Sequence, residues 1–234
     1  MSARDQKQAE IDYPHLVGDE GREWLRNKPF RNDPWVTARF LIDFAHVLQI
    51  LDLHAGMSLV ELGCGPGWMT RFAARHGLDA VGYDIAPEMI AIARELAEGE
   101  APSARFEVGD MEQLDLGRRF DAVLLYDALH HSPRADLVLA SAHRALRAGG
   151  RLLLVTSSIL GLDATLRGLE AAGLRASVVA RERGPLGPLM SGRRRHLERA
   201  GMLAPGQREE DVLVVRGVLE AAAPARGVAA GVER

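Results

Sequence analysis

The feature that most constrains the fold is a regular alternation of short apolar segments and longer amphipathic segments, which begins at Met57. The short segments predict strands, and the longer ones carry apolar residues at helical spacing. Strands this apolar are typical of a parallel sheet that helices cover on both faces. We therefore expect an α/β fold with a doubly wound, mostly parallel sheet and right-handed crossovers. The predicted strands span residues 58–62, 80–84, 104–108, 120–126, 151–157, 175–180 and 211–216, and the helices between them span 68–76, 87–98, 134–147 and 163–172.

The pattern divides the chain into three parts. Residues 1–55 predict a helical lead-in or lid, in which residues 1–19 are loosely ordered and helices follow at 20–27 and 34–53. Residues 56–220 form the core, with 181–210 as an inserted connection that contains a short helix near 193–200. Residues 221–234, rich in Ala, Gly, Val and Arg, predict a disordered tail.

Composition narrows the class of protein. Hydrophobic residues make up 47% of the chain and charged residues 26%, a balance typical of soluble globular proteins. A formal net charge of -3 argues against a surface built mainly for nucleic acid. The single cysteine, Cys64, rules out an intramolecular disulfide. Without a signal-like or membrane-spanning apolar run, we expect a cytoplasmic protein, whose oligomeric state the sequence does not determine.

A glycine-rich turn follows the first predicted strand. Gly63, Gly65 and Gly67 allow a sharp bend and a close approach of a ligand to the backbone. A helix begins directly afterwards, so its free N–H groups face the same crevice. A pyrophosphate-binding turn would need a small residue at position 68, where this chain has Trp68. The turn alone is weak evidence, since dinucleotide enzymes have one too, but Trp68 disfavours pyrophosphate binding. Cys64 within the turn is interpreted as a small neutral filler.

Acidic residues end the next two strands. Asp84 is placed to accept hydrogen bonds from both ribose hydroxyls of a nucleoside, and Ile85 to lie against its base. Asp110 is placed to accept from an adenine amino group, and the Met111 amide to donate to a ring nitrogen. The alternatives are a helix cap for Asp84 and an ordinary turn for Asp110.

Together these residues resemble the class I S-adenosylmethionine-dependent methyltransferase family, over roughly residues 40–180. The fourth-strand segment, residues 120–131, and the lead into the fifth strand, residues 146–155, contribute to the resemblance. It implies a seven-stranded Rossmann-like sheet whose last strand is antiparallel. It also implies S-adenosylmethionine as cofactor, S-adenosylhomocysteine as product, and a position for Glu61 near the amino-acid portion of the donor. We expect Tyr126 or Asp127 to touch the methionine end of the donor.

Methyl transfer by such a protein is an in-line displacement that depends mainly on alignment of the reactants. It needs no metal, and the His, Asp and Cys residues show no metal-ligand spacing. If the acceptor is a hydroxyl, its proton needs a base, for which His131 and then His130 are the candidates. The alternative is that both histidines only cap the next helix or line the donor pocket.

Two further groups of residues are candidates for contact with the acceptor. Trp24, Lys28, Phe30 and Trp35 precede the core, where they would close a lid over it, or else simply pack between helices. The basic run at residues 193–196 would suit an anionic acceptor, and a solvated helix face is the alternative.

The sequence thus favours a methyltransferase that acts on a small molecule, such as a sugar or a natural-product hydroxyl. One alternative is an RNA or protein methyltransferase, for which an added binding module or an Asn-Pro-Pro-Tyr-like segment after the fourth strand would be evidence. Another is a donor-binding regulatory subunit without catalysis. The identity of the acceptor and the methylated atom remain open at this point.

Overall fold

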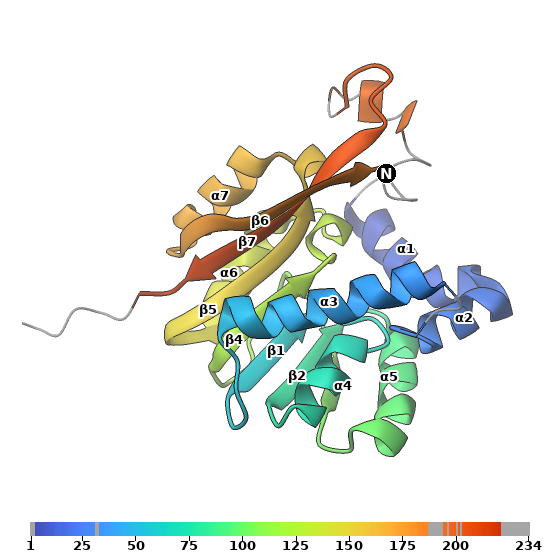
Figure 1. The fold of residues 1–234 in the computed structure, drawn as a ribbon, viewed down its shortest axis with the longest axis vertical. Helices are drawn as coiled ribbons and strands as arrows, with labels where there is room; N and C mark the ends of the chain where they lie inside the picture. Colours follow the sequence, from blue (N-terminus) through green and yellow to red (C-terminus); the bar gives the residue numbers. More distant parts are fainter. Residues whose placement is uncertain are drawn as a thin grey trace, which may run out of the picture.

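The computed structural model describes residues 3–30, 33–186, 194–195, 197–199, 201 and 203–220. Seven strands form one sheet in the order β3-β2-β1-β4-β5-β7-β6, and only β7 runs antiparallel to its neighbours (Figure 1). This confirms the α/β, doubly wound architecture and the antiparallel final strand. The strands are β1 (Ser58–Leu62), β2 (Asp79–Asp84), β3 (Arg105–Val108), β4 (Phe120–Tyr126), β5 (Leu146–Ser157), β6 (Arg175–Pro185) and β7 (Glu209–Val218).

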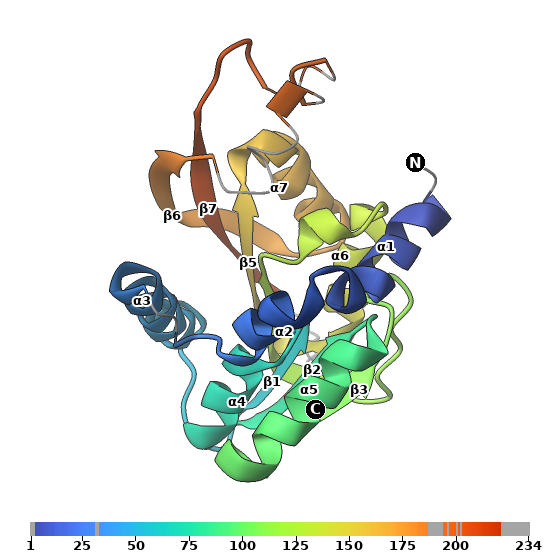
Figure 2. The same ribbon diagram turned by 90° about the vertical axis from the view of Figure 1, so that its right-hand side faces the viewer.

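Helices cover both faces of the sheet because the central strands are apolar on both sides. On one face, α3 (Pro34–Leu51) and α4 (Trp68–Arg75) pack on buried side chains such as Leu59 and Leu124. On the other face, α6 (Ala135–Ala145) and α7 (Leu162–Ala171) pack on residues such as Val123. Helix α5 (Pro87–Glu100) lies against β2 and β3. Figure 2 shows α1 (Ala3–Leu16) and α2 (Gly18–Arg26) beside α5.

The register of the sheet determines where the predicted site lies. Strands β1, β2, β3, β4 and β5 are parallel, with Leu62 level with Tyr83, and Asp84 level with Val108. The carboxyl ends of these strands therefore meet at one edge, which is where ligands bind in open α/β sheets. The short 3₁₀ helix η1 (Leu129–His131) follows β4 at this edge, and a second one, η2 (Ser158–Leu160), follows β5.

One expectation for the N-terminus is wrong. Within the loose lead-in expected at 1–19, Ala3–Leu16 is helical and is held by residues far away in sequence. The Lys7 ammonium binds Asp110 and Glu112, and the Gln6 amide donates to the backbone oxygen of His131. Such long-range contacts stabilise a helix whose own apolar pattern is weak.

Several predicted boundaries also move. Strand β5 begins at Leu146, inside the predicted helix at 134–147, because Leu146 pairs with Phe120 ahead of a bulge in the ladder. Strands β6 and β7 extend further than predicted and shorten the connection expected at 181–210. In that connection, residues 194–195 and 197–199 are helical. The predicted tail at 221–234 lies outside the described residues. None of the described helices is both long and apolar enough to span a bilayer, and the cytoplasmic location stays a prediction.

Candidate functional site

A cavity of about 550 Å³ lies at the carboxyl edge of the sheet, and we refer to it as the glycine-turn pocket. Its volume is in the range of small-molecule sites, about 300–1,000 Å³. Its lining brings together nine residues singled out from the sequence: Glu61, Gly63, Cys64, Asp84, Ile85, Asp110, Met111, Tyr126 and Asp127. Gly65 and Gly67 belong to the same turn but do not line the cavity.

The three positions of the turn favour glycine for partly different structural reasons. All three have positive φ angles, between 52° and 75°. A Cβ on Gly63 would lie 2.6 Å from that of Ala128, and a Cβ on Gly67 would lie 2.3 Å from the Phe106 ring. These two glycines therefore permit close packing of the chain. A Cβ on Gly65 would meet no atom within 4 Å, so only Gly65 leaves open space beside the turn.

Asp84 connects the end of β2 to the turn. Its Oδ2 accepts a hydrogen bond of 2.8 Å from the Gly65 amide, and its Oδ1 accepts one of 2.9 Å from the Ala86 amide. Burial raises the pKa of this carboxyl, although both backbone donors favour the ionised form. The Ala86 contact is an Asx-type turn just before α5 and not a hydrogen bond to the first-turn N–H groups of the helix, so it does not make Asp84 a helix cap. Each carboxylate oxygen retains a further lone pair.

Glu61 is a buried carboxyl, 2% exposed, at the inner end of the cavity. Both the amide and the hydroxyl of Thr70, in the first turn of α4, donate to its Oε2. Burial raises the pKa of Glu61 to about 7, against the opposing effects of Thr70 and the positive charge of Lys28. The Lys28 ammonium lies 5.4 Å from the centre of the Trp24 ring, and both residues line the cavity.

Asp110 contacts the N-terminal helix. Its Oδ2 accepts a hydrogen bond of 2.6 Å from the Lys7 ammonium, and its Oδ1 accepts one of 3.0 Å from the Glu112 amide. Lys7 also forms an ion pair with the Glu112 carboxylate. Helix α1 is thus attached to the third strand end beside the cavity.

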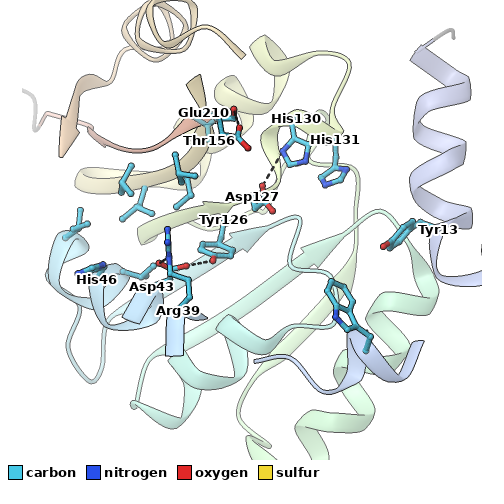
Figure 3. A pocket seen from close by; sticks show the side chains of 18 residues that line it. Tyr13, Arg39, Asp43, His46, Tyr126, Asp127, His130, His131, Thr156 and Glu210 are labelled. Carbon is cyan, nitrogen blue, oxygen red and sulfur yellow. Dashed lines mark hydrogen bonds and ion pairs between the residues drawn. The ribbon is translucent and has the colours of Figure 1, made fainter. Parts of the chain in front are cut away.

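A second cavity, of about 590 Å³, adjoins the first, and we refer to it as the β7 pocket (Figure 3). The two cavities share a wall formed by Tyr13, Trp24, Tyr126, Asp127 and His131. The backbone of Asp127 has a φ of 52°, which is uncommon for a residue other than glycine and is often found at functional sites.

A chain of polar contacts fixes Tyr126 at this shared wall. The Tyr126 hydroxyl donates to Asp43 Oδ2 at 2.5 Å, and Asp43 Oδ1 accepts from Arg39 Nε at 3.0 Å. Arg39 Nη1 donates in turn to Glu182 on β6 at 2.7 Å. Burial and the neighbouring Asp43 raise the pKa of the Tyr126 phenol well above its ordinary value, so the phenol remains a donor. The Trp68 ring packs edge-on against Tyr126 from the other side.

His131 lines both cavities, whereas His130 lines only the β7 pocket. The Oε2 atom of Glu10, on α1, lies 3.0 Å from the Nδ1 atom of His131. Burial disfavours the charged ring, but Glu10 and the more distant Asp127 and Asp84 outweigh it and raise the pKa of His131. The two histidine rings are 4.0 Å apart between centroids.

The structure separates the other sequence candidates. Trp24 and Lys28 line the glycine-turn pocket, while Phe30 and Trp35 line neither cavity and are 62% and 85% exposed. In the basic run at 193–196, only residues 194 and 195 are described, and they line neither cavity. Burial raises the pKa of the Cys64 thiol well above its ordinary value, as suits an unreactive filler.

The sequence analysis does not single out many of the lining residues, among them Lys7, Glu10, Tyr13, Arg39 and Asp43 on the N-terminal helices. All five lie on helices that precede the sheet, and no local sequence signal distinguishes them from solvated helix residues. Among the described part of the chain, no three His, Cys, Asp or Glu side chains cluster in a way that suits a metal ion. The absence of a metal requirement stays a prediction.

Comparison with known proteins points in the same direction as the geometry. Residues 59–150 match the family model described as a methyltransferase domain. The ubiquinone biosynthesis O-methyltransferase of Azorhizobium caulinodans is 30% identical over 139 residues, which cover 59% of this chain and 53% of that protein. The chain thus spans about half the length of the curated relatives it matches.

Solved structures support the fold. Phosphoethanolamine N-methyltransferase 2 of Haemonchus contortus, in complex with S-adenosylhomocysteine, matches 95% of this chain and 61% of its own, with 18% identity and a TM-score of 0.65. The cyclase SpnF matches 94% of this chain and 97% of its own, with 17% identity and a TM-score of 0.65. One of these proteins is named as a cyclase, so the shared fold does not by itself identify the reaction.

Proposed function

We propose that the chain is a class I S-adenosylmethionine-dependent methyltransferase, and that it transfers the methyl group of S-adenosylmethionine to a hydroxyl of a small-molecule acceptor. The observation that carries this proposal is the pair of adjoining cavities with one shared wall. One cavity holds the predicted donor residues and the other has room for an acceptor.

The residues of the glycine-turn pocket fit the chemistry of the donor. Gly63 lines this cavity and lets a ligand approach the main chain, and the neighbouring Gly65 leaves open space at the turn. The Glu61 carboxyl suits an ammonium group, and the nearby Lys28 suits a carboxylate, which are the two charged groups of an amino acid. Asp84 has lone pairs for ribose hydroxyls, and Ile85 and Met111 give apolar surface to a base. The donor-binding set is thus Glu61, Gly63, Cys64, Gly65, Gly67, Asp84, Ile85, Asp110, Met111, Tyr126 and Asp127.

When bound, S-adenosylmethionine supplies an electrophilic methyl group, which an acceptor oxygen takes as the carbon–sulfur bond breaks and its electron pair passes to sulfur. Tyr126 and Asp127, on the shared wall, position the two reactants for this displacement. Asp43 and Arg39 hold the Tyr126 ring in place. Trp24 helps to exclude water from the junction.

His131 is the base that takes the acceptor proton in this proposal, and His130 is the second candidate. With Nδ1 of His131 facing Glu10, Nε2 is the ring nitrogen left for the acceptor. Glu10 orients the imidazole and stabilises the imidazolium that forms. This arrangement of an acceptor, a histidine and a carboxylate favours a hydroxyl acceptor. The curated relatives are likewise named as O-methyltransferases.

The proposal is tested with S-adenosylmethionine that carries an isotopic label in its methyl group, incubated with the protein and a fractionated cell extract. Label in small metabolites supports it. Label in RNA or protein supports the alternative acceptor class instead. Donor binding without any labelled product would point to a regulatory subunit.

A further inference from the structure

The chemistry of the β7 pocket restricts which acceptor it can hold. Much of its surface comes from aliphatic side chains on three elements: Val47 and Ile50 of α3, Leu153 and Val155 of β5, and Val212 and Val214 of β7. Apolar walls of this extent favour a ligand with an apolar body, because burying the apolar surface of the ligand against them contributes favourable hydrophobic free energy. A polyol such as a sugar would leave its hydroxyls without partners along these walls.

The charged residues of the β7 pocket make it unsuitable for an acceptor that carries an anionic group. Among the described lining residues, Arg39 is the one guanidinium or ammonium group, and it already has two carboxylate partners. Asp43 lies 3.0 Å from Arg39 and Glu182 lies 2.7 Å from it. No cation in this described lining is therefore left over to neutralise a carboxylate or phosphate on the acceptor.

Other polar groups of the pocket reinforce this electrostatic picture. Asp127 lies at the shared wall and Glu210 at the start of β7, where the Ser157 hydroxyl donates to it. Figure 3 shows Glu210 beside Thr156, away from Asp43 and Arg39. Among the described residues, the buried Thr156 hydroxyl has no hydrogen-bond partner. The carboxylates of Asp127 and Glu210 repel an anion and accept hydrogen bonds from O–H or N–H groups.

The histidines do not change this balance. His131 faces the Glu10 carboxylate, and His130 lies 3.6 Å from Asp127. His46, on α3, lines the pocket on the Asp43 side. Each histidine is thus accompanied by an acidic residue on its own or a neighbouring element.

From these observations we infer that the β7 pocket takes a hydroxylated compound with a largely apolar body and no anionic group. This inference rests on the proposed function for the identity of the pocket as an acceptor site. It assigns the acceptor to natural-product-like phenols and alcohols, and it excludes sugar phosphates and carboxylic acids. Asp43 and Val214 become specificity-determining residues, the first through charge and the second through the apolar wall.

The test compares three catechols that differ in one substituent: 4-ethylcatechol, 3,4-dihydroxyphenylacetamide and 3,4-dihydroxyphenylacetate. Binding to the full chain is measured by calorimetry in the presence of S-adenosylhomocysteine, so that the result does not depend on turnover. We expect 4-ethylcatechol to bind at least about tenfold more tightly than the acetate, a difference of about 1.4 kcal/mol. The amide separates charge from polarity, and it should bind more tightly than the acetate.

Two variants locate the effect. Asp43→Asn leaves Arg39 with one carboxylate partner, so the affinity for the acetate relative to that for 4-ethylcatechol should rise several-fold, whatever the common effect of a looser Tyr126 ring on both ligands. Val214→Thr adds a hydroxyl to the wall at nearly constant volume and should weaken 4-ethylcatechol binding several-fold. Thermal unfolding of both variants establishes that they fold.

The inference is overturned if the acetate binds as tightly as 4-ethylcatechol, or if none of the three catechols binds at millimolar concentration. An unchanged ratio of acetate affinity to 4-ethylcatechol affinity in a folded Asp43→Asn protein would also count against it. Failure of the proposed function has a different signature, because S-adenosylhomocysteine itself would then not bind.

Discussion

The Oε2 atom of Glu10, on the N-terminal helix, lies 3.0 Å from the Nδ1 atom of His131, just beyond the fourth strand. These residues are far apart in sequence, and their contact gives the candidate base a carboxylate partner. Because Glu10 raises the pKa of His131, the ring holds its proton to a higher pH than an isolated histidine. A base has to be unprotonated to act, so turnover should fall as the pH drops through the pKa of His131.

Glu10→Gln should therefore move the acid limb of the kcat/KM profile to lower pH, since the neutral amide no longer favours the imidazolium. The maximal rate should also fall, because the ring loses its orientation. Asp12→Asn on the same helix is the matched control and should leave the profile unchanged. An acid limb at the same pH in Glu10→Gln would show that His131 is not the titrating base.

His131→Asn should lower kcat by a factor of about 10²–10⁴, the usual contribution of general base catalysis. Donor affinity should stay nearly the same, because the base acts on the acceptor proton. The measurements are steady-state turnover and calorimetric binding of S-adenosylmethionine. Full activity would transfer the role to His130 or remove the need for a base, and His130→Asn distinguishes these two cases.

Asp84→Ala should weaken binding of S-adenosylmethionine at least about tenfold, because charge-assisted hydrogen bonds contribute about 1.5–3 kcal/mol. The variant also frees the Gly65 amide, which Asp84 now holds at the turn. Asp79→Ala, at the opposite end of the same strand, is the control, since Asp79 pairs with Arg105 and Arg118 on the surface. Equal calorimetric affinity in Asp84→Ala and the wild type would contradict the assignment.

Gly65→Ala should lower the free energy of unfolding by about 1–2 kcal/mol, because its φ of 52° disfavours any residue with a Cβ. Donor affinity should decrease as well, since the new methyl group would occupy the open space beside the turn. Gly99→Ala, in helix α5, is the contrast and should stabilise the protein by about 0.5–1 kcal/mol. Chemical denaturation measures both changes, and a Gly65→Ala protein with unchanged donor affinity would rule out close contact with the turn.

Glu61 should release a proton when the donor binds just below neutral pH. Its pKa of about 7 in the free protein means that much of it is protonated there, and an ammonium group beside it favours the carboxylate. Donor affinity should consequently fall as the pH decreases below about 7. Calorimetry in buffers of different ionisation enthalpy measures the proton directly. Glu61→Gln should abolish the release, and persistence of the full release in that variant would place the proton elsewhere.

The sequence predicts the sheet well where local pattern alone decides. The predicted bounds of strands β1 and β4 agree with the structure to the residue, because each is a short, mainly apolar segment that a turn ends. The start of β5 was missed because Leu146 continues the helical pattern of α6 and becomes a strand residue only through its pairing with Phe120. Helix α1 was missed because its stability comes from partners such as Asp110, more than a hundred positions away.

The same distinction applies to the site. The residues at the strand ends were identified because glycines and acidic residues follow apolar strands in a fixed order, and the parallel register brings them together. Glu10 and Asp43 lie on helices whose docking depends on tertiary packing, and their sequence neighbourhoods carry no such order. The contribution of Glu10 and Asp43 to the site is therefore visible only in three dimensions.

Helix α1 contacts two chemically different places at once, since Lys7 binds Asp110 beside the glycine turn and Glu10 binds His131 at the shared wall. In the proposed methyltransferase, a motion that lifts the whole of α1 from the edge of the sheet would break both contacts together. A molecule open for exchange of its nucleoside is then a poor catalyst, and a competent catalyst is closed to exchange. Such mutual exclusion would protect a reactive sulfonium from water between turnovers.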